Sequence, residues 1–199
     1  MIKLCYIDVE TTGTNHYKNG LIQLAGTIYF LVEDRYEKEE EFNFKIKPFP
    51  EDVIEDEALK INKITREDLK HFFEPKVIYQ DLLEIFGRHC DKFKREDKMF
   101  FVGYNSRFDY DFVRKFWEKC GDKYFGSFFF FPPVDVMNVA IVHLIEQRHT
   151  LPNFKLGTVA EYLKIKTDGE LHDAMVDIET TRLIFEKFVN LNGGNDGRD

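Results

Sequence analysis

The first third of the chain has the hydrophobic pattern of β-strands. Residues 2–9 and 21–32 are apolar runs rich in strand-forming side chains, and residues 42–46 alternate apolar and polar positions. The turn-rich residues 13–20 separate the first two strands, and a charged hairpin region, residues 33–41, leads into the third. We expect the acidic run 37–41 within this region to be a solvated loop.

The remainder of the chain alternates helical and strand-like patterns. Apolar periodicity predicts helices over residues 77–93, 105–120, 135–147, 156–163 and 173–190. Residues 99–104 form one buried strand, and residues 128–131 form a second short one that Pro132 and Pro133 end. Three strands followed by alternating helices and strands predict an α/β fold, with helices on both faces of one sheet.

Asp8 and Glu10 lie two residues apart where the first predicted strand ends. Side chains with this spacing in a strand point to the same face of the sheet. Two neighbouring carboxylates at the edge of a core are costly unless a cation lies between them. A divalent metal ion, which prefers hard oxygen ligands, is the simplest cation for such a pair.

Two helical acids also point inward. Asp109 lies on the apolar stripe of the predicted helix 105–120, and Asp177 lies on that of helix 173–190. Asp111 and Glu179 lie on the charged faces of the same helices, where ordinary surface pairs form. Asp109 could instead be a helix-start carboxylate stabilised by the helix dipole, but its inward position favours a partner. If the four inward acids converge, they surround a metal pair of the kind that clamps the two oxygens of a phosphoryl transfer.

Size and charge limit the classes of protein that fit. A chain of 199 residues can form one domain with a sizeable core, so we expect a single domain over residues 1–190 and a flexible tail over 191–199. A formal net charge of −8 argues against a large non-specific nucleic-acid surface. It allows a small site where metal ions meet phosphate.

The cysteines and the hydropathy bear on location. Three widely spaced cysteines are typical of reduced thiols, so we expect a cytoplasmic protein. We also expect no signal peptide and no membrane association, because no apolar run reaches transmembrane length.

Three motifs occur in order along the chain. They are Asp8-Val9-Glu10-Thr11-Thr12-Gly13, Gly103-Tyr104-Asn105-Ser106-Arg107-Phe108-Asp109 and His172-Asp173-Ala174-Met175-Val176-Asp177. Together they closely resemble the motifs of the DEDDh family of 3′→5′ exonucleases, and the similarity spans about residues 2–188. The four residues between His172 and Asp177 distinguish this branch from its tyrosine-bearing relatives. One such motif is weak evidence, whereas three in order are specific.

The resemblance implies a ribonuclease H-like mixed sheet flanked by helices and hydrolysis of single-stranded 3′ ends to nucleoside 5′-monophosphates. It implies that two Mg²⁺ or Mn²⁺ ions bind to four carboxylates, those of Asp8, Glu10, Asp109 and Asp177. His172 would deprotonate the attacking water. The implied contacts to the terminal nucleotide come from the backbone of Thr11 and Thr12, a wedge formed by Ile64, and a wall formed by Asn105 and Phe108.

Two departures from the family pattern bear on the substrate. Asn62-Lys63 and Tyr104 stand where relatives often have His-Gly and His, which leaves base and sugar preference open. We expect DNA to be slightly preferred over RNA, with an RNA-trimming or oligonucleotide-degrading exoribonuclease as the close alternative, because no residue indicates a 2′-OH contact. Association with a DNA polymerase as an accessory subunit is a further hypothesis. A catalytically dead binding module is disfavoured because all five motif residues are present.

Overall fold

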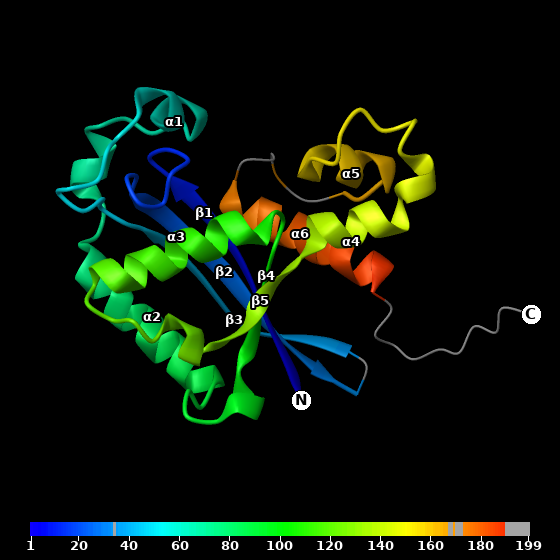
Figure 1. Cartoon of the computed structure of the whole chain (residues 1–199), viewed down its shortest axis with the longest axis horizontal. Coiled ribbons are helices and arrows are strands. Elements are labelled where there is room, and N and C mark those ends of the chain that lie inside the picture. Colours follow the sequence, from blue (N-terminus) through cyan, green and yellow to red (C-terminus); the bar gives the residue numbers. More distant parts are fainter. Residues whose placement is uncertain (34, 167–168, 170–172, 190–199) are drawn as a thin grey trace, which may run out of the picture.

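The computed structural model describes residues 1–33, 35–166, 169 and 173–189 of the chain. A five-stranded sheet lies at its centre, with the strand order β3-β2-β1-β4-β5 (Figure 1). The strands are β1 (Ile2–Thr11), β2 (Leu21–Val32), β3 (Arg35–Lys45), β4 (Met99–Gly103) and β5 (Phe129–Asp135). The first three strands pair antiparallel, whereas β4 pairs parallel with both β1 and β5. The predicted mixed α/β sheet is therefore confirmed.

Six α-helices surround this sheet in the described part of the chain. They are α1 (Asp56–Ile61), α2 (Pro75–His89), α3 (Ser106–Lys119), α4 (Val136–His143), α5 (Leu156–Tyr162) and α6 (Ala174–Phe188). The predictions for α3, α5 and α6 are correct to within two residues at each end. The predicted helix 77–93 ends earlier, because Cys90 is extended and turns its buried thiol into the core. The predicted helix 135–147 likewise ends at His143. The sequence did not predict α1.

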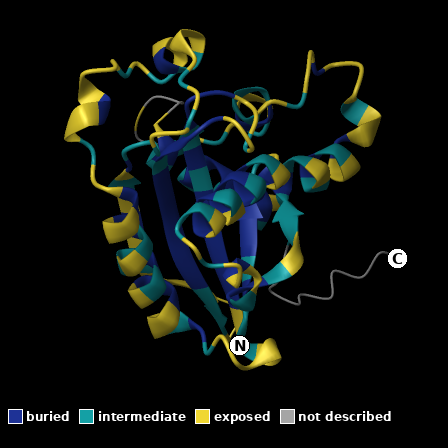
Figure 2. Ribbon diagram, turned by 60° about the vertical axis from the view of Figure 1, so that its left-hand side comes forward, coloured by how far each residue is buried: buried dark blue, intermediate teal, exposed yellow. Residues whose placement is uncertain are grey.

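Two apolar cores lie on opposite faces of the sheet. Cys5, Ile7 and Val9 of β1 pack with residues of α2 and α3, whereas Leu4 and Tyr6 pack with residues of α4, α5 and α6. This division follows from the alternation of side chains along a strand. Figure 2 shows the buried strands between helices whose outer sides are exposed. Helices therefore cover both faces, as predicted.

The acidic run 37–41 is part of β3 and does not form a loop. Glu37 pairs with Phe30, and Glu41 pairs with Thr27, in the antiparallel ladder with β2. β3 is an edge strand, and charged side chains on an edge protect it from pairing with other chains. Pairing with the long strand β2 thus overrides the weak strand preference of glutamate.

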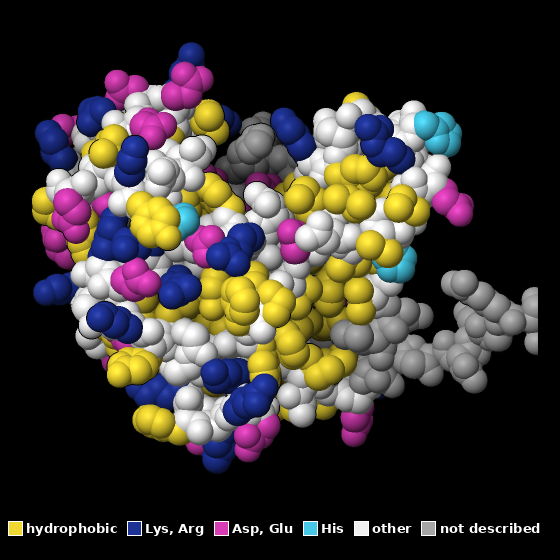
Figure 3. All heavy atoms as spheres, viewed as in Figure 1, with side chains coloured by type: hydrophobic (Ala, Val, Ile, Leu, Met, Phe, Trp, Pro, Cys, Tyr) yellow, Lys and Arg dark blue, Asp and Glu magenta, His cyan; other side chains and the backbone are white. Residues whose placement is uncertain are grey.

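The two prolines after Phe131 do not end the last strand. β5 continues through Pro132 and Pro133 to Asp135, and Phe131 is 62% exposed, so the prediction of a short buried strand is wrong. β5 is the outer strand beyond β4, where proline is tolerated because fewer backbone N–H groups must join the ladder. Apolar side chains gather over β5 and α4 on the face of the molecule that Figure 3 shows.

Within the described ranges, none of the helices has the length and apolar character needed to cross a membrane. The cytoplasmic location stays a prediction. So do the single-domain boundary at residue 190 and the flexible tail, since residues 190–199 lie outside the described part of the chain.

Candidate active site

The end of β1 carries the first two acids of the site. Asp8 pairs with Ala25 of β2 and Glu10 pairs with Gln23, and the register shifts between Glu10 and Thr11. Such a shift marks a bulge, which bends a strand and re-aims its side chains at the rim of a sheet. Both acids are partly buried and lie where β1 leaves the sheet.

The turn from β4 into α3 brings Asp109 to this rim. Asn105 adopts the left-handed conformation, with φ 61° and ψ 41°, which asparagine tolerates better than most residues. A side chain on Gly103 would stand 3.1 Å from the Ile7 carbonyl oxygen, so glycine lets β4 approach β1 closely there. Asp109 is only 5% exposed, and its Oδ1 accepts a hydrogen bond of 3.2 Å from the backbone N–H of Val9. The predicted inward acid thus contacts the residue between Asp8 and Glu10.

The first turn of α6 supplies Asp177. α6 packs on the face of β1 that carries Leu4 and Tyr6, which is also the face of Asp8 and Glu10. Asp177 is partly buried, and its charge acts on both strand acids. The structure therefore brings together the four acids that the sequence selected. His172 lies outside the described residues.

The buried carboxyl groups perturb one another strongly. Burial raises the pKa of Asp8 well above its usual range, and the charges of Asp109, Glu10 and Asp177 raise it further. Burial also raises the pKa of Asp109, against the opposing effect of its backbone hydrogen bonds. The pKa of Glu10 rises to about 7, mainly because the group is buried and secondly because of Asp177.

The chemistry of this donor set fits a hard divalent cation. The charges that raise the pKa of Asp8 most, those of Asp109, Glu10, Asp177 and Asp173, are all carboxylates. Carboxylate oxygens are the ligands that Mg²⁺ and Mn²⁺ prefer. No three Asp, Glu, His or Cys side chains of the described ranges are arranged round one point as ligands of a single ion.

The two threonines that follow Glu10 are held mainly through their backbone and hydroxyl groups. The Thr11 carbonyl oxygen accepts a hydrogen bond of 3.0 Å from Asn62 Nδ2. Thr12 is fully buried, and its hydroxyl donates to the Val53 carbonyl oxygen at 2.7 Å. The structure thus places residue 62, one of the departures from the family pattern, directly beside the rim.

The remaining predicted residues lie on the segments that follow α1 and β4. Ile64 is partly buried against the small core of Ile22, Leu59 and Leu69. Lys63 has a φ of 54°, which lies in the left-handed region that favours glycine. Asn105 is exposed.

Phe108 and Tyr104 face different neighbours. Phe108 is partly buried, with its ring 4.8 Å from that of Phe112. The Tyr104 hydroxyl donates to the Phe154 carbonyl oxygen at 2.7 Å, so this second departure from the family pattern is held toward the segment before α5.

Sequence reasoning gave no role to Asp135, an acid near the site. Asp135 caps the N-terminus of α4, accepts a 3.0 Å hydrogen bond from the Asn105 N–H, and raises the pKa of Asp109. The signal that could have identified it is the preference for Asp directly before a helix. Asp111 accepts from Arg107 at 2.7 Å in an exposed helix pair, as predicted. Glu179 pairs with Arg182 at 2.6 Å, but this pair is partly buried, because Arg182 lies over the ring of Tyr29.

Comparisons with known proteins agree with this fold and site. The RNase T family model, described as Exonuclease, matches residues 5–185. Ribonuclease T of Shewanella oneidensis is 30% identical over 191 residues, and the match covers 92% of this chain and 80% of the relative. Ribonuclease T of Shewanella baltica is also 30% identical, with the same coverage.

Solved structures of exonuclease I share the fold. One has a TM-score of 0.75 and 19% identity, and the match covers 94% of this chain but only 41% of that chain. E. coli exonuclease I in complex with a dT13 oligonucleotide has a TM-score of 0.72 and 20% identity, with the same shares covered. A zinc-bound form of the E. coli exonuclease I complex with single-stranded DNA has a TM-score of 0.73.

The mixed sheet with flanking helices is the ribonuclease H-like fold that the sequence motifs predicted. The chain belongs to the exonuclease family that the RNase T model defines, and it is a 3′–5′ exonuclease of the DEDDh type.

The raised pKa values predict how stability of the metal-free protein depends on pH. A carboxyl whose pKa is raised in the folded state holds its proton more tightly there than in the unfolded chain. Its contribution favours folding below the unfolded pKa of about 4 and is lost as pH rises through the folded value. For Glu10 the folded value is about 7, and for Asp8 and Asp109 it is also raised.

With chelator present, we therefore expect the Tm to fall as the pH rises from about 5 to about 8. Asp8→Asn removes one titrating group and one repulsive charge, so it should lessen this fall, whereas Asp111→Asn should leave it as in the wild type. Scanning calorimetry at several pH values measures the difference. An equal fall in the wild type and in Asp8→Asn would contradict the prediction.

Proposed function

We propose that this exonuclease removes nucleotides from single-stranded 3′ ends, releases nucleoside 5′-monophosphates, and acts chiefly on RNA. The convergence of Asp8, Glu10, Asp109 and Asp177 on the rim at the end of β1 carries the proposal. Hydrolysis of a phosphodiester requires positive charge where the phosphate reacts, and this cluster of oxygen donors is suited to hold it.

Each group of residues has a proposed role. The four acids hold two divalent ions, Mg²⁺ or Mn²⁺. When bound, such ions lower the pKa of water and offset the charge that develops on the phosphate. His172, a histidine near the start of α6 in the sequence, accepts the proton of the attacking water. The backbone of Thr11 and Thr12 receives the terminal nucleotide, Ile64 wedges against its base, and Asn105 and Phe108 form the opposite wall.

The relatives guide the choice of substrate. The two Shewanella relatives described above are named Ribonuclease T, which favours RNA. DNA is the second candidate, because the structural neighbours include complexes of exonuclease I with DNA oligonucleotides. The slight DNA preference expected from the sequence stays untested. Association with a DNA polymerase also stays a prediction.

The surface charge is consistent with recognition of a strand end. On the face shown in Figure 3, Lys and Arg side chains are interspersed with Asp and Glu and form no continuous basic stripe. The net charge of −8 likewise disfavours strong binding along a long phosphate backbone. Affinity concentrated at one terminal nucleotide and its metal site suits a protein of this composition.

The activity is tested with matched single-stranded RNA and DNA oligonucleotides labelled at the 5′ end. With Mg²⁺ or Mn²⁺ we expect stepwise shortening from the 3′ end and release of nucleoside 5′-monophosphates, faster for RNA. Chelator should abolish the reaction. Blocking the 3′-terminal nucleotide should slow it, while blocking the 5′ end should not. Internal cleavage, or release of 3′-monophosphates, would contradict the proposal.

His172 provides a second prediction. General-base catalysis contributes roughly 10²–10⁴-fold to rate, so His172→Ala should lower kcat by about that factor. The variant should keep the Tm increase caused by Mn²⁺, because the carboxylates remain. His143→Ala is a matched control, since His143 lies in α4 with its ring stacked on Phe188. Wild-type kcat in His172→Ala would overturn the assignment of the base.

A further inference from the structure

The loop after β1 is closed by hydrogen bonds across its base. The Thr12 N–H donates to the Gly20 carbonyl oxygen at 2.9 Å, and the Gly20 N–H donates to the Thr12 hydroxyl oxygen at 2.8 Å. Thr12 is fully buried, so these bonds are shielded from water. The conformation of residues 12–20 is therefore fixed where it joins the acidic rim.

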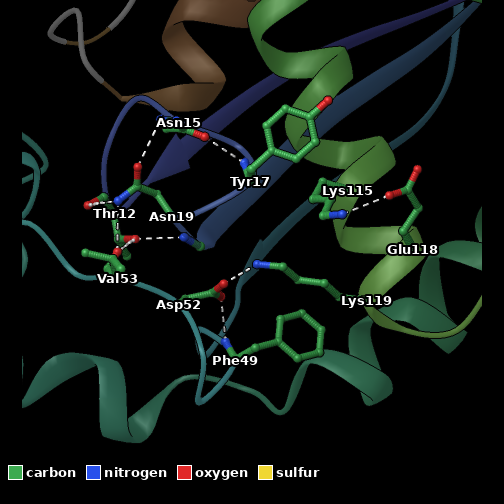
Figure 4. Close-up of polar contacts among 11 residues, drawn as sticks. Thr12, Asn15, Tyr17, Asn19, Phe49, Asp52, Val53, Lys115, Glu118 and Lys119 are labelled. Atoms are coloured by element: carbon green, nitrogen blue, oxygen red, sulfur yellow. Dashed lines mark hydrogen bonds and ion pairs between the residues drawn. The ribbon is translucent and has the colours of Figure 1, made fainter.

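Asn19 occupies the interior of this loop (Figure 4). It is only 2% exposed, and both ends of its carboxamide are used. Its Oδ1 accepts from the Asn15 N–H at 2.9 Å, while its Nδ2 donates to the Val53 carbonyl oxygen at 3.0 Å and to Glu55 Oε1 at 2.9 Å. One side chain thus joins the loop to a segment that lies more than thirty residues further along the chain.

Gly13 leaves the space that Asn19 needs. A Cβ at position 13 would stand 2.4 Å from Asn19 Nδ2 and 2.5 Å from Glu55 Oε1, distances that real Cβ atoms do not have. Gly13, the last residue of the first sequence motif, therefore allows the close approach of Asn19 and Glu55.

The segment that Asn19 binds also determines the position of α1. The Glu55 N–H donates to the Thr12 carbonyl oxygen at 2.9 Å, and α1 begins at the next residue. At the far end of α1, Asn62 Nδ2 donates to the Thr11 carbonyl oxygen at 3.0 Å. Hydrogen bonds from the two ends of the short helix α1 thus hold the carbonyl groups of Thr11 and Thr12, the two residues after Glu10.

A buried ion pair joins the segment before Val53 to α3. The Asp52 side chain is 1% exposed and pairs with Lys119, and its Oδ2 accepts from the Phe49 N–H at 2.8 Å (Figure 4). A Cβ on Gly20 would stand 2.6 Å from Asp52 Oδ2, so this carboxylate packs directly on the base of the loop. α3 is the helix that carries Asp109.

On the basis of the proposed function, we propose that Asn19 is a positioning residue for the 3′-terminal nucleotide. By joining the loop to residues 53–55, it holds the Thr11–Thr12 backbone and α1 in one arrangement relative to the acids on β1. In this arrangement the nucleoside of the substrate binds against the Thr11–Thr12 backbone and α1, and the reacting phosphate binds at the acids on β1. Loss of Asn19 should therefore weaken the binding of the nucleoside and leave phosphodiester chemistry largely intact.

Two small substrates separate these contributions. One is a p-nitrophenyl ester of a nucleoside 5′-monophosphate, and the other is bis(p-nitrophenyl) phosphate, which has no nucleoside. For Asn19→Ala we expect kcat/KM on the nucleoside ester to fall about tenfold, mainly through a higher KM, because a small misplacement of a binding group is costly. On bis(p-nitrophenyl) phosphate we expect a change of less than about twofold. Asn43→Ala, an exposed asparagine on β3, is the matched control and should change neither value.

A second variant disturbs the same contact from the other side. Gly13→Ala should displace the Asn19 side chain and reproduce its selective loss on the nucleoside ester. Gly87→Ala is the control, because this glycine lies in α2 and an added Cβ would have nothing within 4 Å. It should leave activity on both substrates unchanged and slightly raise the Tm, since alanine is the better helix former.

If Asn19→Ala lowered kcat/KM equally on the two substrates, Asn19 would only support the fold in general. That result would overturn the positioning role. Unchanged KM on the nucleoside ester would overturn it as well. Failure of the proposed function gives a different result, because the wild-type protein would then shorten neither RNA nor DNA oligonucleotides with Mg²⁺ or Mn²⁺ present.

Discussion

Repulsion among like carboxylates at the end of β1 is the constraint on which the site depends. Burial and the charges of Glu10, Asp109 and Asp177 all act against ionisation of Asp8. A fold normally keeps such groups apart or pairs them with cations, because buried charge is costly. Here the cost is concentrated at one rim, while large apolar cores on both faces of the sheet supply the stability of the rest. Positive charge bound among these acids therefore stabilises the ionised form of all of them.

The mixed sheet explains how distant segments meet at this rim. β1 and β4 run parallel, so the turn that leaves β4 begins beside the end of β1. Asn105 makes that turn in a left-handed conformation, and Asp109 follows in the first turn of α3. Glycines at positions 103 and 13 allow close approach on either side, the first to Ile7 and the second to Asn19. The positions of the acids at this rim thus depend on the backbone geometry of the turns and glycines beside them.

The sequence predicted those parts that follow from periodicity. Alternation along β1 put Asp8 and Glu10 on one face, and the apolar stripes of α3 and α6 selected Asp109 and Asp177 over their exposed neighbours. Features that depend on pairing partners escaped prediction. The charged strand β3 exists because β2 pairs with it, and β5 tolerates two prolines because it is the outer strand. The hydrogen bonds of Asn19 join segments more than thirty residues apart, which no local pattern reveals.

Thermal unfolding with increasing Mn²⁺ tests most directly whether the clustered acids hold divalent cations. A ligand that binds only the folded state raises the Tm as its concentration increases. The wild type should show this rise, and Asp8→Asn or Asp177→Asn should reduce it. Glu179→Gln should retain it, because Glu179 pairs with Arg182 and is not among the acids that act on Asp8. Equal shifts in all of these proteins, or no shift in the wild type, would contradict the account.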